Sequence, residues 1–333
     1  MSIKCAVVGY GSAHSMGAHH CGQIRNTEGL ELVAVADPVV ERAALAAQQE
    51  GVPAYSSLTE LLAKSDVEMV TLVTPHDTHA RLAIEALNAG RHVISEKVMC
   101  LDTGEADLMI AAAGKNHRML SVYHNRRWDT DYVTVRSVID AGLLGEVFDI
   151  ESAVGGYGRP GGWRGEKKHG GGMLYDWGAH LVDQAVQMVP AKPVSVFATM
   201  QYRVWDVDVE THASVHVIFA NGCVAHIDLG NISWIPRHRW LVRGEAGALF
   251  KQTLGDESRA RVHTSVDGLR TQMEIDPVPA SWESFYQNIA AHLLKGAELI
   301  VKPAQVRVAI AVIEAAFKSA ETGAVVQLSD LGV

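Results

Sequence analysis

The chain has 333 residues, of which 48% are hydrophobic, and this length exceeds one ordinary core, so we expect two globular domains. Its 29 lysines and arginines stand against 38 aspartates and glutamates, and the net charge of −9 argues against a nucleic-acid-binding or anionic-membrane surface. Small molecules or other proteins are therefore the expected partners.

The four cysteines are too sparse for a disulfide framework and show no C-x-x-C spacing: Cys5, Cys21, Cys100 and Cys223. The chain starts without a basic leader and apolar segment, and no apolar run approaches ~18 residues. We therefore expect a cytoplasmic protein with no membrane partner.

Short apolar runs alternate with alanine-rich helical segments through the first 125 residues. Near-continuous apolar strands separated by helices are typical of a doubly wound parallel sheet with both faces covered. The expected buried strands are residues 3–8, 32–36, 69–73, 92–94 and 119–123.

The pattern changes near residue 125, where we place the domain boundary, with one domain at 1–125 and the other at 126–333. A helix is expected at 131–141, followed by a long glycine-rich loop at 155–172. Alternating apolar and polar residues then predict an antiparallel sheet. Its expected strands are 194–204, 213–219 and 223–229, with further helices at 281–294 and 304–321.

A candidate dinucleotide site follows the first strand. Gly9-Tyr10-Gly11 provides a turn at which the backbone can approach a pyrophosphate, and Asp37 ends the second strand, where a carboxylate accepts hydrogen bonds from ribose hydroxyls. The third glycine of the usual fingerprint is replaced by His14, and Gly17 comes three residues late. The alternative is a simple turn in which Asp37 is an N-cap.

The expected cofactor is NAD rather than NADP. A carboxylate at Asp37 would repel a 2′-phosphate, and no arginine follows it until Arg42.

Asp176 and His180 lie four residues apart, just after three glycines. On a helix this spacing places a carboxylate and an imidazole on one face, where such a pair can shuttle a proton. A solvated pair on a helix surface is the alternative.

Further polar motifs follow the third and fourth strands, at the carboxyl ends where ligands bind in such sheets. With these motifs, the chain resembles the Gfo/Idh/MocA oxidoreductases, the glucose–fructose oxidoreductase and inositol dehydrogenase family, over essentially its whole length. The resemblance is carried by the glycine turn, Thr74-Pro75 with His79, Glu96-Lys97, Asn125-Arg126-Arg127, Leu144-Gly145-Glu146-Val147, and the glycine triplet with Asp176 and His180.

The resemblance implies that Lys97, Asp176 and His180 face the substrate beside the nicotinamide. It also implies a C-terminal domain with a large open sheet, one face covering the substrate site and the other forming a homodimer or homotetramer. The segments 125–129 and 162–164 resemble the scyllo-inositol dehydrogenase-like branch more than the glucose–fructose branch. The expected cofactor-binding residues are Gly9, Gly11, Ser12, Ala13, Asp37, Thr74, Pro75, His79, Glu96, Lys97 and Asn125.

Two features depart from the family pattern. Val98 replaces the proline of a Glu-Lys-Pro motif, so the fixed φ after Lys97 is lost. The glycine loop at 9–20 is also longer than the standard turn.

The expected chemistry is oxidation of a secondary alcohol, which requires a base and a cation that tolerates alkoxide charge. We expect His180 to take the proton, Lys97 to hydrogen-bond the reacting oxygen and Asp176 to orient His180 or a neighbouring hydroxyl. In the glycine-rich loop, Trp163 and Arg164 could hold a sugar ring, although Trp163 could equally pack within the loop. No metal site is expected from the nearby histidines at 14, 19 and 20, because adjacent ring vectors diverge on a helix.

The leading interpretation is an NAD-dependent dehydrogenase or reductase acting on a cyclitol, aldose or related sugar. One alternative is a glycosidase that uses bound NAD for a transient oxidation and elimination, which would release no net NADH. The other is a non-catalytic, dinucleotide-dependent regulator, which would have little reason to keep Lys97, Asp176 and His180 together.

Overall fold

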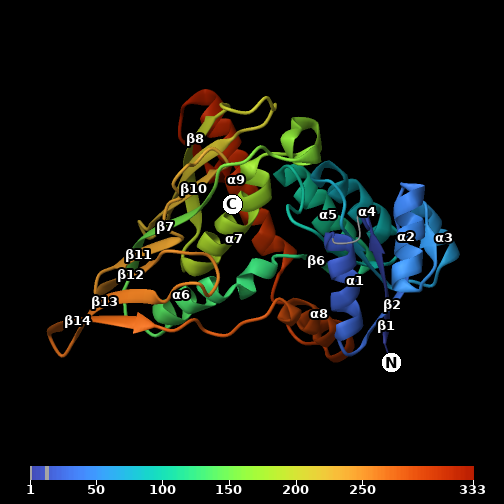
Figure 1. Cartoon of the computed structure of the whole chain (residues 1–333), viewed down its shortest axis with the longest axis horizontal. Helices are drawn as coiled ribbons and strands as arrows, with labels where there is room; N and C mark the ends of the chain where they lie inside the picture. Colours follow the sequence, from blue (N-terminus) through green and yellow to red (C-terminus); the bar gives the residue numbers. More distant parts are fainter. Residues whose placement is uncertain (1, 12–14) are drawn as a thin grey trace. The chain divides into compact units, whose positions relative to one another are not determined.

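The structure of the protein is a computed structural model that describes residues 2–11 and 15–333. The chain divides into two units (Figure 1). The first contains the residues up to His124 and the later segment Glu283–Arg307, and the second contains Asn125–Trp282 and Val308–Val333.

A parallel six-stranded sheet forms the centre of the first unit, with the order β3-β2-β1-β4-β5-β6. The order reverses between β1 and β4, which is the point where a doubly wound sheet binds its ligands. The strands are β1 (Ile3–Val8), β2 (Leu30–Ala36), β3 (Ala54–Tyr55), β4 (Met69–Leu72), β5 (His92–Ser95) and β6 (Leu120–Val122).

Helices flank this sheet, and α8, from the later segment of the chain, packs against α1 (Figure 1). Two of the helices begin at residues with side-chain caps: Ser57 accepts from the amide of Glu60, and Asp102 accepts from the amide of Glu105. The helices are α1 (Met16–Asn26), α2 (Val40–Glu50), α3 (Leu58–Lys64), η1 (His76–Thr78), α4 (His79–Asn88), α5 (Thr103–Asn116) and α8 (Glu283–Lys295).

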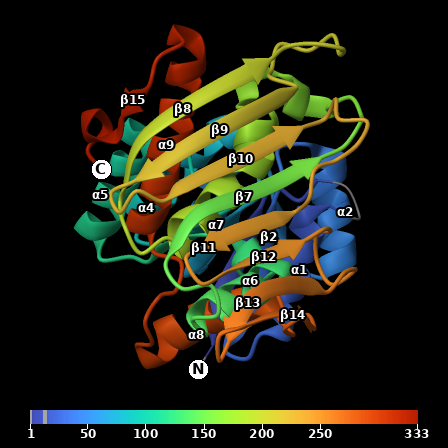
Figure 2. The ribbon, with the colours of Figure 1, turned by 90° about the vertical axis from the view of Figure 1, so that its left-hand side faces the viewer.

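The second unit is built on a nine-stranded sheet with the order β14-β13-β12-β11-β7-β10-β9-β8-β15 (Figure 2). Its pairs are antiparallel except β7 with β10, which is parallel. The strands are β7 (Val147–Gly155), β8 (Pro193–Gln201), β9 (His212–Phe219), β10 (Val224–Gly230), β11 (Trp240–Gly244), β12 (Gly247–Lys251), β13 (Ala260–Val266), β14 (Leu269–Ile275) and β15 (Val326–Gln327).

The two faces of this sheet differ. In β9, Val215 and Val217 are buried, whereas His216 and Ile218 are more exposed, so one face of the sheet is buried and the other is more exposed. Helices α6, α7 and α9 lie behind the sheet as drawn in Figure 2. The helices and single turns of this unit are η2 (Asn125–Trp128), α6 (Thr130–Asp140), η3 (Gly162–Gly165), η4 (Lys167–His169), η5 (Leu174–Gly178), α7 (Ala179–Met188), α9 (Pro303–Thr322) from Val308 onward, and η6 (Leu328–Leu331).

The predicted fold class is confirmed: a doubly wound parallel sheet is combined with a large, mostly antiparallel sheet. The predicted strands correspond to β1, β2, β4, β5, β6, β8, β9 and β10. The sequence analysis did not predict β3 and β15, which have two residues each, or β7 and β11–β14.

Candidate active site

The glycine turn follows β1 and lies against the end of β4. Gly9 has φ +94°, and a β carbon at this position would lie 2.2 Å from the carbonyl oxygen of Val73. Its amide donates to the carbonyl oxygen of Ala36 at 2.7 Å, and Gly11 also has a positive φ, of +75°. Glycine is therefore required at both positions, because a side chain would be strained in this conformation.

Gly17 lies in the first turn of α1, where a β carbon would be 2.2 Å from the carbonyl oxygen of Tyr10. The late glycine thus allows the start of the helix to pack directly on the turn, which is the task of the third glycine in the usual fingerprint. The predicted cofactor residues Ser12 and Ala13, and also His14, lie outside the described residues.

Asp37 holds the glycine turn from the end of β2. Its Oδ2 accepts from the amides of Tyr10 and Gly11 at 3.0 and 3.1 Å, and its Oδ1 accepts from the amide of Val39 at 2.9 Å. The N-cap position of α2 is occupied by Val39, so Asp37 is not the N-cap that the alternative interpretation required. The carboxylate is instead part of the turn.

His79 joins the turn after β4 to the turn after β5. Its Nε2 lies 2.9 Å from the carbonyl oxygen of Thr74, and its Nδ1 lies 2.7 Å from that of Val98. Burial lowers the pKa of His79, although the two carbonyl oxygens favour the protonated ring. Thr74 and Pro75 are therefore tied to the segment that contains Lys97.

Lys97 follows β5, and its backbone amide donates to Oε2 of Glu96 at 2.9 Å. The Lys97–Val98 peptide bond is cis, and Val98 is buried. The carboxylate of Glu96 is also buried and lies 3.0 Å from the ring of His20. The predicted residues of the first unit therefore gather at the carboxyl ends of β1, β2, β4 and β5.

In the second unit, Asp176 belongs to the π-helical turn η5, which runs directly into α7 with His180 in its first turn. The Asp176 side chain is 19% exposed, whereas His180 is only 4% exposed. The ring of Trp177 lies between them in sequence, with its centroid 6.2 Å from that of His180. Single π turns within α-helices are frequent at functional sites.

Arg164 of the glycine-rich loop reaches Asp176, and Trp163 packs against Arg164. Nε of Arg164 lies 3.2 Å from Oδ2 of Asp176, and the guanidinium carbon of Arg164 is 4.6 Å from the centre of the Trp163 ring. The cation on the indole face and the carboxylate thus form one polar cluster. The predicted residues Trp163, Arg164 and Asp176 come together in this unit.

Glu210 lies beneath the glycine triplet. Its Oε1 accepts from the amide of Leu174 at 2.8 Å, and a β carbon on Gly172 would lie 2.4 Å from both carboxylate oxygens. Burial raises the pKa of Glu210 to about 7, although the backbone hydrogen bonds oppose this rise. Nothing in the sequence pattern singled out this residue, which follows β8 by nine residues and precedes β9.

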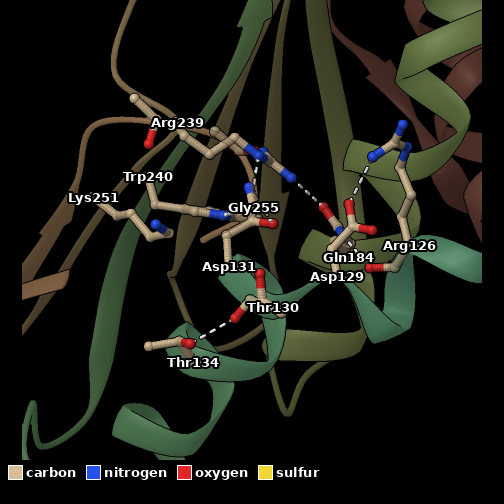
Figure 3. Close-up of polar contacts among 12 residues, drawn as sticks. Arg126, Asp129, Thr130, Asp131, Thr134, Gln184, Arg239, Trp240, Lys251 and Gly255 are labelled. Atoms are coloured by element: carbon tan, nitrogen blue, oxygen red, sulfur yellow. Dashed lines mark hydrogen bonds and ion pairs between the residues drawn. The ribbon is translucent and has the colours of Figure 1, made fainter. Parts of the chain in front are cut away.

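A network of buried polar side chains holds α7 one turn beyond His180 (Figure 3). Gln184 donates to the carbonyl oxygen of Arg126 at 2.7 Å and accepts from Nη2 of Arg239 at 2.7 Å. Asp131 lies 2.9 Å from Nε of Arg239 and accepts from the Trp240 indole at 2.8 Å. These contacts join α7 to the backbone of η2 and, through Arg239, to Asp131 of α6.

A second buried contact fixes the same helix. Asp183 accepts from Nε and Nη2 of Arg127 at 2.8 and 2.6 Å, which is a two-point contact between η2 and α7. The neighbouring Arg126 guanidinium lies 4.2 Å from the centre of the Trp177 ring. The π-helical turn and the start of α7 are therefore held by side chains from η2.

Comparison with known proteins decides the family. Residues 3–124 match the oxidoreductase family with an NAD-binding Rossmann fold, and residues 132–250 match the Gfo/Idh/MocA C-terminal domain. An oxidoreductase of Schizosaccharomyces pombe is 30% identical over 314 residues, covering 82% of this chain and 85% of that protein. The chain belongs to the Gfo/Idh/MocA oxidoreductase family.

Other members of the family extend this result. The scyllo-inositol 2-dehydrogenase (NADP⁺) of Bacillus subtilis is 28% identical, covering 79% of this chain and 80% of that protein. The solved structure of an NAD-binding protein from Listeria innocua is 31% identical, with a TM-score of 0.88 and coverage of 98% and 97% of the two chains. The predicted family and enzyme class, an NAD(P)-dependent oxidoreductase, are therefore confirmed.

Two kinds of feature are absent from the described residues, 2–11 and 15–333. Within these ranges no group of three or more His, Cys, Asp or Glu side chains is arranged to hold a metal ion. No helix within the same ranges has the length and apolar character needed to cross a membrane.

The predicted site residues fall into two groups. Lys97 lies in the first unit with the glycine turn and Asp37, whereas Asp176 and His180 lie in the second, as does Asn125, buried at the start of η2. In the second unit Trp163, Arg164 and Asp176 form one cluster, and His180 follows Asp176 in the first turn of α7. Sequence patterns did not single out the residues behind these groups, which are His20, Tyr286, Glu210, Gln184 and Arg239.

Proposed function

We propose that the protein is an NAD-dependent dehydrogenase or reductase that moves a hydride between nicotinamide and a hydroxyl or carbonyl carbon of a sugar, cyclitol or related polyol. The observation that carries the proposal is the bridge of His79 between the carbonyl oxygens of Thr74 and Val98, which ties Lys97 to the edge of the glycine turn. Relatives named inositol 2-dehydrogenase and scyllo-inositol 2-dehydrogenase support the substrate class.

The residues at this edge fit a dinucleotide. Helix α1 begins at Met16, five residues after Gly11, and has no acidic residue in its first turn, which suits a pyrophosphate at its N-terminus. We propose that residues 1–125 bind the cofactor and that residues 126–333 bind the substrate. The proposed cofactor contacts are Gly9, Gly11, Ser12, Ala13, Asp37, Thr74, Pro75, His79, Lys97 and Asn125, with Glu96 acting through the backbone of Lys97.

In the proposed mechanism, Lys97, Asp176 and His180 act on the same substrate. Bound NAD supplies the hydride acceptor. His180 takes the hydroxyl proton, and the ammonium group of Lys97 hydrogen-bonds the same oxygen and stabilises its developing negative charge. Asp176 orients His180 or a neighbouring substrate hydroxyl, and Trp163 with Arg164 binds the ring of the substrate.

The proposal includes NAD rather than NADP. The Asp37 carboxylate lies at the glycine turn, and it would repel a 2′-phosphate. Two exposed apolar residues, Val39 and Val40, and then Glu41 come before Arg42 in the chain. The NADP⁺-dependent relative of Bacillus subtilis makes this a direct experimental question, which Kd values for both reduced cofactors would answer.

The function is tested with a panel of polyols and sugars, each assayed with NAD and NADP by absorbance of the reduced cofactor. With a confirmed substrate, His180→Ala should lower kcat by about 10²–10⁴-fold, as for loss of a general base. His263→Ala, which changes an exposed histidine on β13 of the same unit, should leave kcat unchanged. Normal turnover by His180→Ala would refute its role, and turnover of a glycoside without net NADH would favour the glycosidase alternative.

We further propose that the chain forms a homodimer or homotetramer through the helix-free face of its large sheet. On this face Phe197 and Ile218 are 38% and 42% exposed, and the rings of His216 and His226 are stacked at 4.3 Å. Light scattering after gel filtration would test the oligomeric state. The four cysteines are buried and free, which supports the proposed cytoplasmic location.

A further inference from the structure

A line of buried polar side chains lies behind Lys97 in the first unit. Oγ1 of Thr71 is 3.2 Å from the hydroxyl oxygen of Tyr286, which is 2.7 Å from Nδ1 of His20. Nε2 of His20 is 3.0 Å from Oε1 of Glu96. The first three side chains are fully buried and Glu96 is 8% exposed, so these contacts are not exchanged with bulk water.

The donors and acceptors give this line a direction. An ionised Glu96 can only accept, and its Oε2 already accepts from the backbone amide of Lys97 at 2.9 Å. Nε2 of His20 must therefore carry a hydrogen and donate a hydrogen bond to Oε1. Hydrogen bonds to an ionised carboxylate are among the stronger contacts in a protein interior.

The electrostatics agree with an ionised Glu96. Burial alone would raise the pKa of this carboxyl, but its contacts with His20 and with Lys97 together outweigh burial and lower the pKa. The carboxylate therefore stays ionised at neutral pH and keeps both of its acceptor positions, one for the imidazole and one for the backbone of Lys97.

The Lys97 turn is thus held from two directions. His79 binds the carbonyl oxygen of Val98 at 2.7 Å, and Glu96 binds the amide of Lys97 itself. The Glu96 side chain is flexible, so the orientation of its carboxylate depends on the groups that contact it. Besides the amide of Lys97, the side chain that contacts the carboxylate is the ring of His20.

We propose that His20, with Tyr286 behind it, is a positioning residue that sets the backbone of Lys97 through the carboxylate of Glu96. The proposal rests on the role of Lys97 in the proposed function, and it adds two residues that touch neither substrate nor cofactor. A misplacement of about 1 Å at a reacting group can lower the rate by about 10²-fold. Loss of the contact between His20 and Glu96 should therefore lower kcat measurably.

The activity test compares two replacements of His20. His20→Leu removes both hydrogen bonds, and it should lower kcat by about 10- to 100-fold while the Kd for NADH changes less than about threefold. His20→Gln keeps one donor and one acceptor on a similar side chain, and it should restore kcat to within about threefold of the wild type. Equal kcat values for wild type and His20→Leu, or equal losses with Leu and Gln, would overturn the proposal.

A matched pair of tyrosines separates the hydrogen bond from packing. Tyr286→Phe removes the hydroxyl that contacts His20 Nδ1, and it should lower kcat by about three- to tenfold. Tyr123→Phe removes a hydroxyl 2.9 Å from the neighbouring His19, although the Tyr123 ring also packs on His20 with centroids 4.4 Å apart, and it should leave kcat unchanged. Equal effects of the two substitutions would contradict the proposal.

A measurement without substrate keeps this inference distinct from the proposed function. In the complete chain, hydrogen exchange at the Lys97 amide should be at least about tenfold faster in His20→Leu than in the wild type, because Glu96 is released. Nitrogen NMR of labelled histidine should show a proton on Nε2 of His20. Unchanged exchange, or a bare Nε2, would overturn the positioning role, whereas a chain that turned over no sugar but showed both results would refute only the proposed function.

Discussion

Replacing Glu210 with glutamine should change how the stability of the second unit depends on pH. The carboxyl is 2% exposed, and burial raises its pKa from an ordinary 4.5 to about 7. The folded protein therefore prefers the protonated carboxyl, and its favourable contribution is complete below pH 4.5 and is lost as the pH rises through 7. Glutamine stays neutral and can still accept from the amide of Leu174.

The size of the effect follows from the two pKa values. The difference between 4.5 and about 7, at about 1.36 kcal/mol per pH unit, corresponds to about 3 kcal/mol, most of which is lost between pH 5 and pH 8. The free energy of unfolding of Glu210→Gln, minus that of the wild type, should therefore increase by about 2–3 kcal/mol over this interval. All other side chains are the same in both proteins, so their contributions cancel in the difference.

Urea unfolding followed by circular dichroism and tryptophan fluorescence at pH 5 and pH 8 would measure this change. Glu245→Gln, which changes an exposed carboxylate in the turn between β11 and β12, is the matched control and should show no such increase. The reasoning would be refuted if the difference in free energy of unfolding between Glu210→Gln and the wild type stayed constant within about 0.5 kcal/mol across this interval. The uncertainty of an extrapolated free energy of unfolding is ~10–15%.

Two further pairs of substitutions test packing and ion pairing. Gly17→Ala would place a β carbon 2.2 Å from the carbonyl oxygen of Tyr10 and should weaken NADH binding and lower the melting temperature, whereas Gly22→Ala, in open space on the same helix, should stabilise by about 0.5–1 kcal/mol. Unchanged NADH binding and an unchanged melting temperature in Gly17→Ala would contradict the close packing of Gly17 on the carbonyl oxygen of Tyr10. Asp183→Ala removes the buried two-point contact with Arg127 and should cost about 3–5 kcal/mol, but Asp140→Ala, at an exposed i, i+4 pair, should cost no more than about 1 kcal/mol. Urea unfolding would measure both variants. Similar losses of unfolding free energy in Asp183→Ala and Asp140→Ala would show that burial does not determine how much an ion pair contributes to stability.

Local patterns predicted five of the six strands of the first sheet, all except the two-residue β3, and the edge at which its polar motifs meet. The carboxyl ends of parallel strands meet at one edge, so Gly9, Asp37 and Lys97 could be assigned to a common region from their positions after predicted strands. Gly17 comes three residues later than the third glycine of the usual fingerprint, and its close packing on Tyr10 explains why glycine is needed there. The loss of proline at Val98 is the other departure from the family pattern, and the bond between His79 and the Val98 carbonyl oxygen accounts for how that turn is held.

The missed features depend on long-range contacts or on small changes of helical geometry. No periodicity distinguishes the π-helical turn around Asp176 from an ordinary α-helical turn. Glu210 reaches the amide of Leu174 across 36 residues, and Arg239 reaches Gln184 across 55. His20 gave no signal beyond a pair of adjacent histidines, because its partner Tyr286 comes 266 residues later.

That separation between His20 and Tyr286 has a consequence for synthesis on the ribosome. At roughly 5–20 residues per second, the interval between the two residues is on the order of 10–50 s. From the synthesis of Glu96 until that of α8, the nascent first sheet has Glu96 and His20 but lacks Tyr286, so its interior histidine stays without the phenol that completes its contacts. The first unit can therefore reach its final hydrogen bonding only when most of the second unit has already emerged.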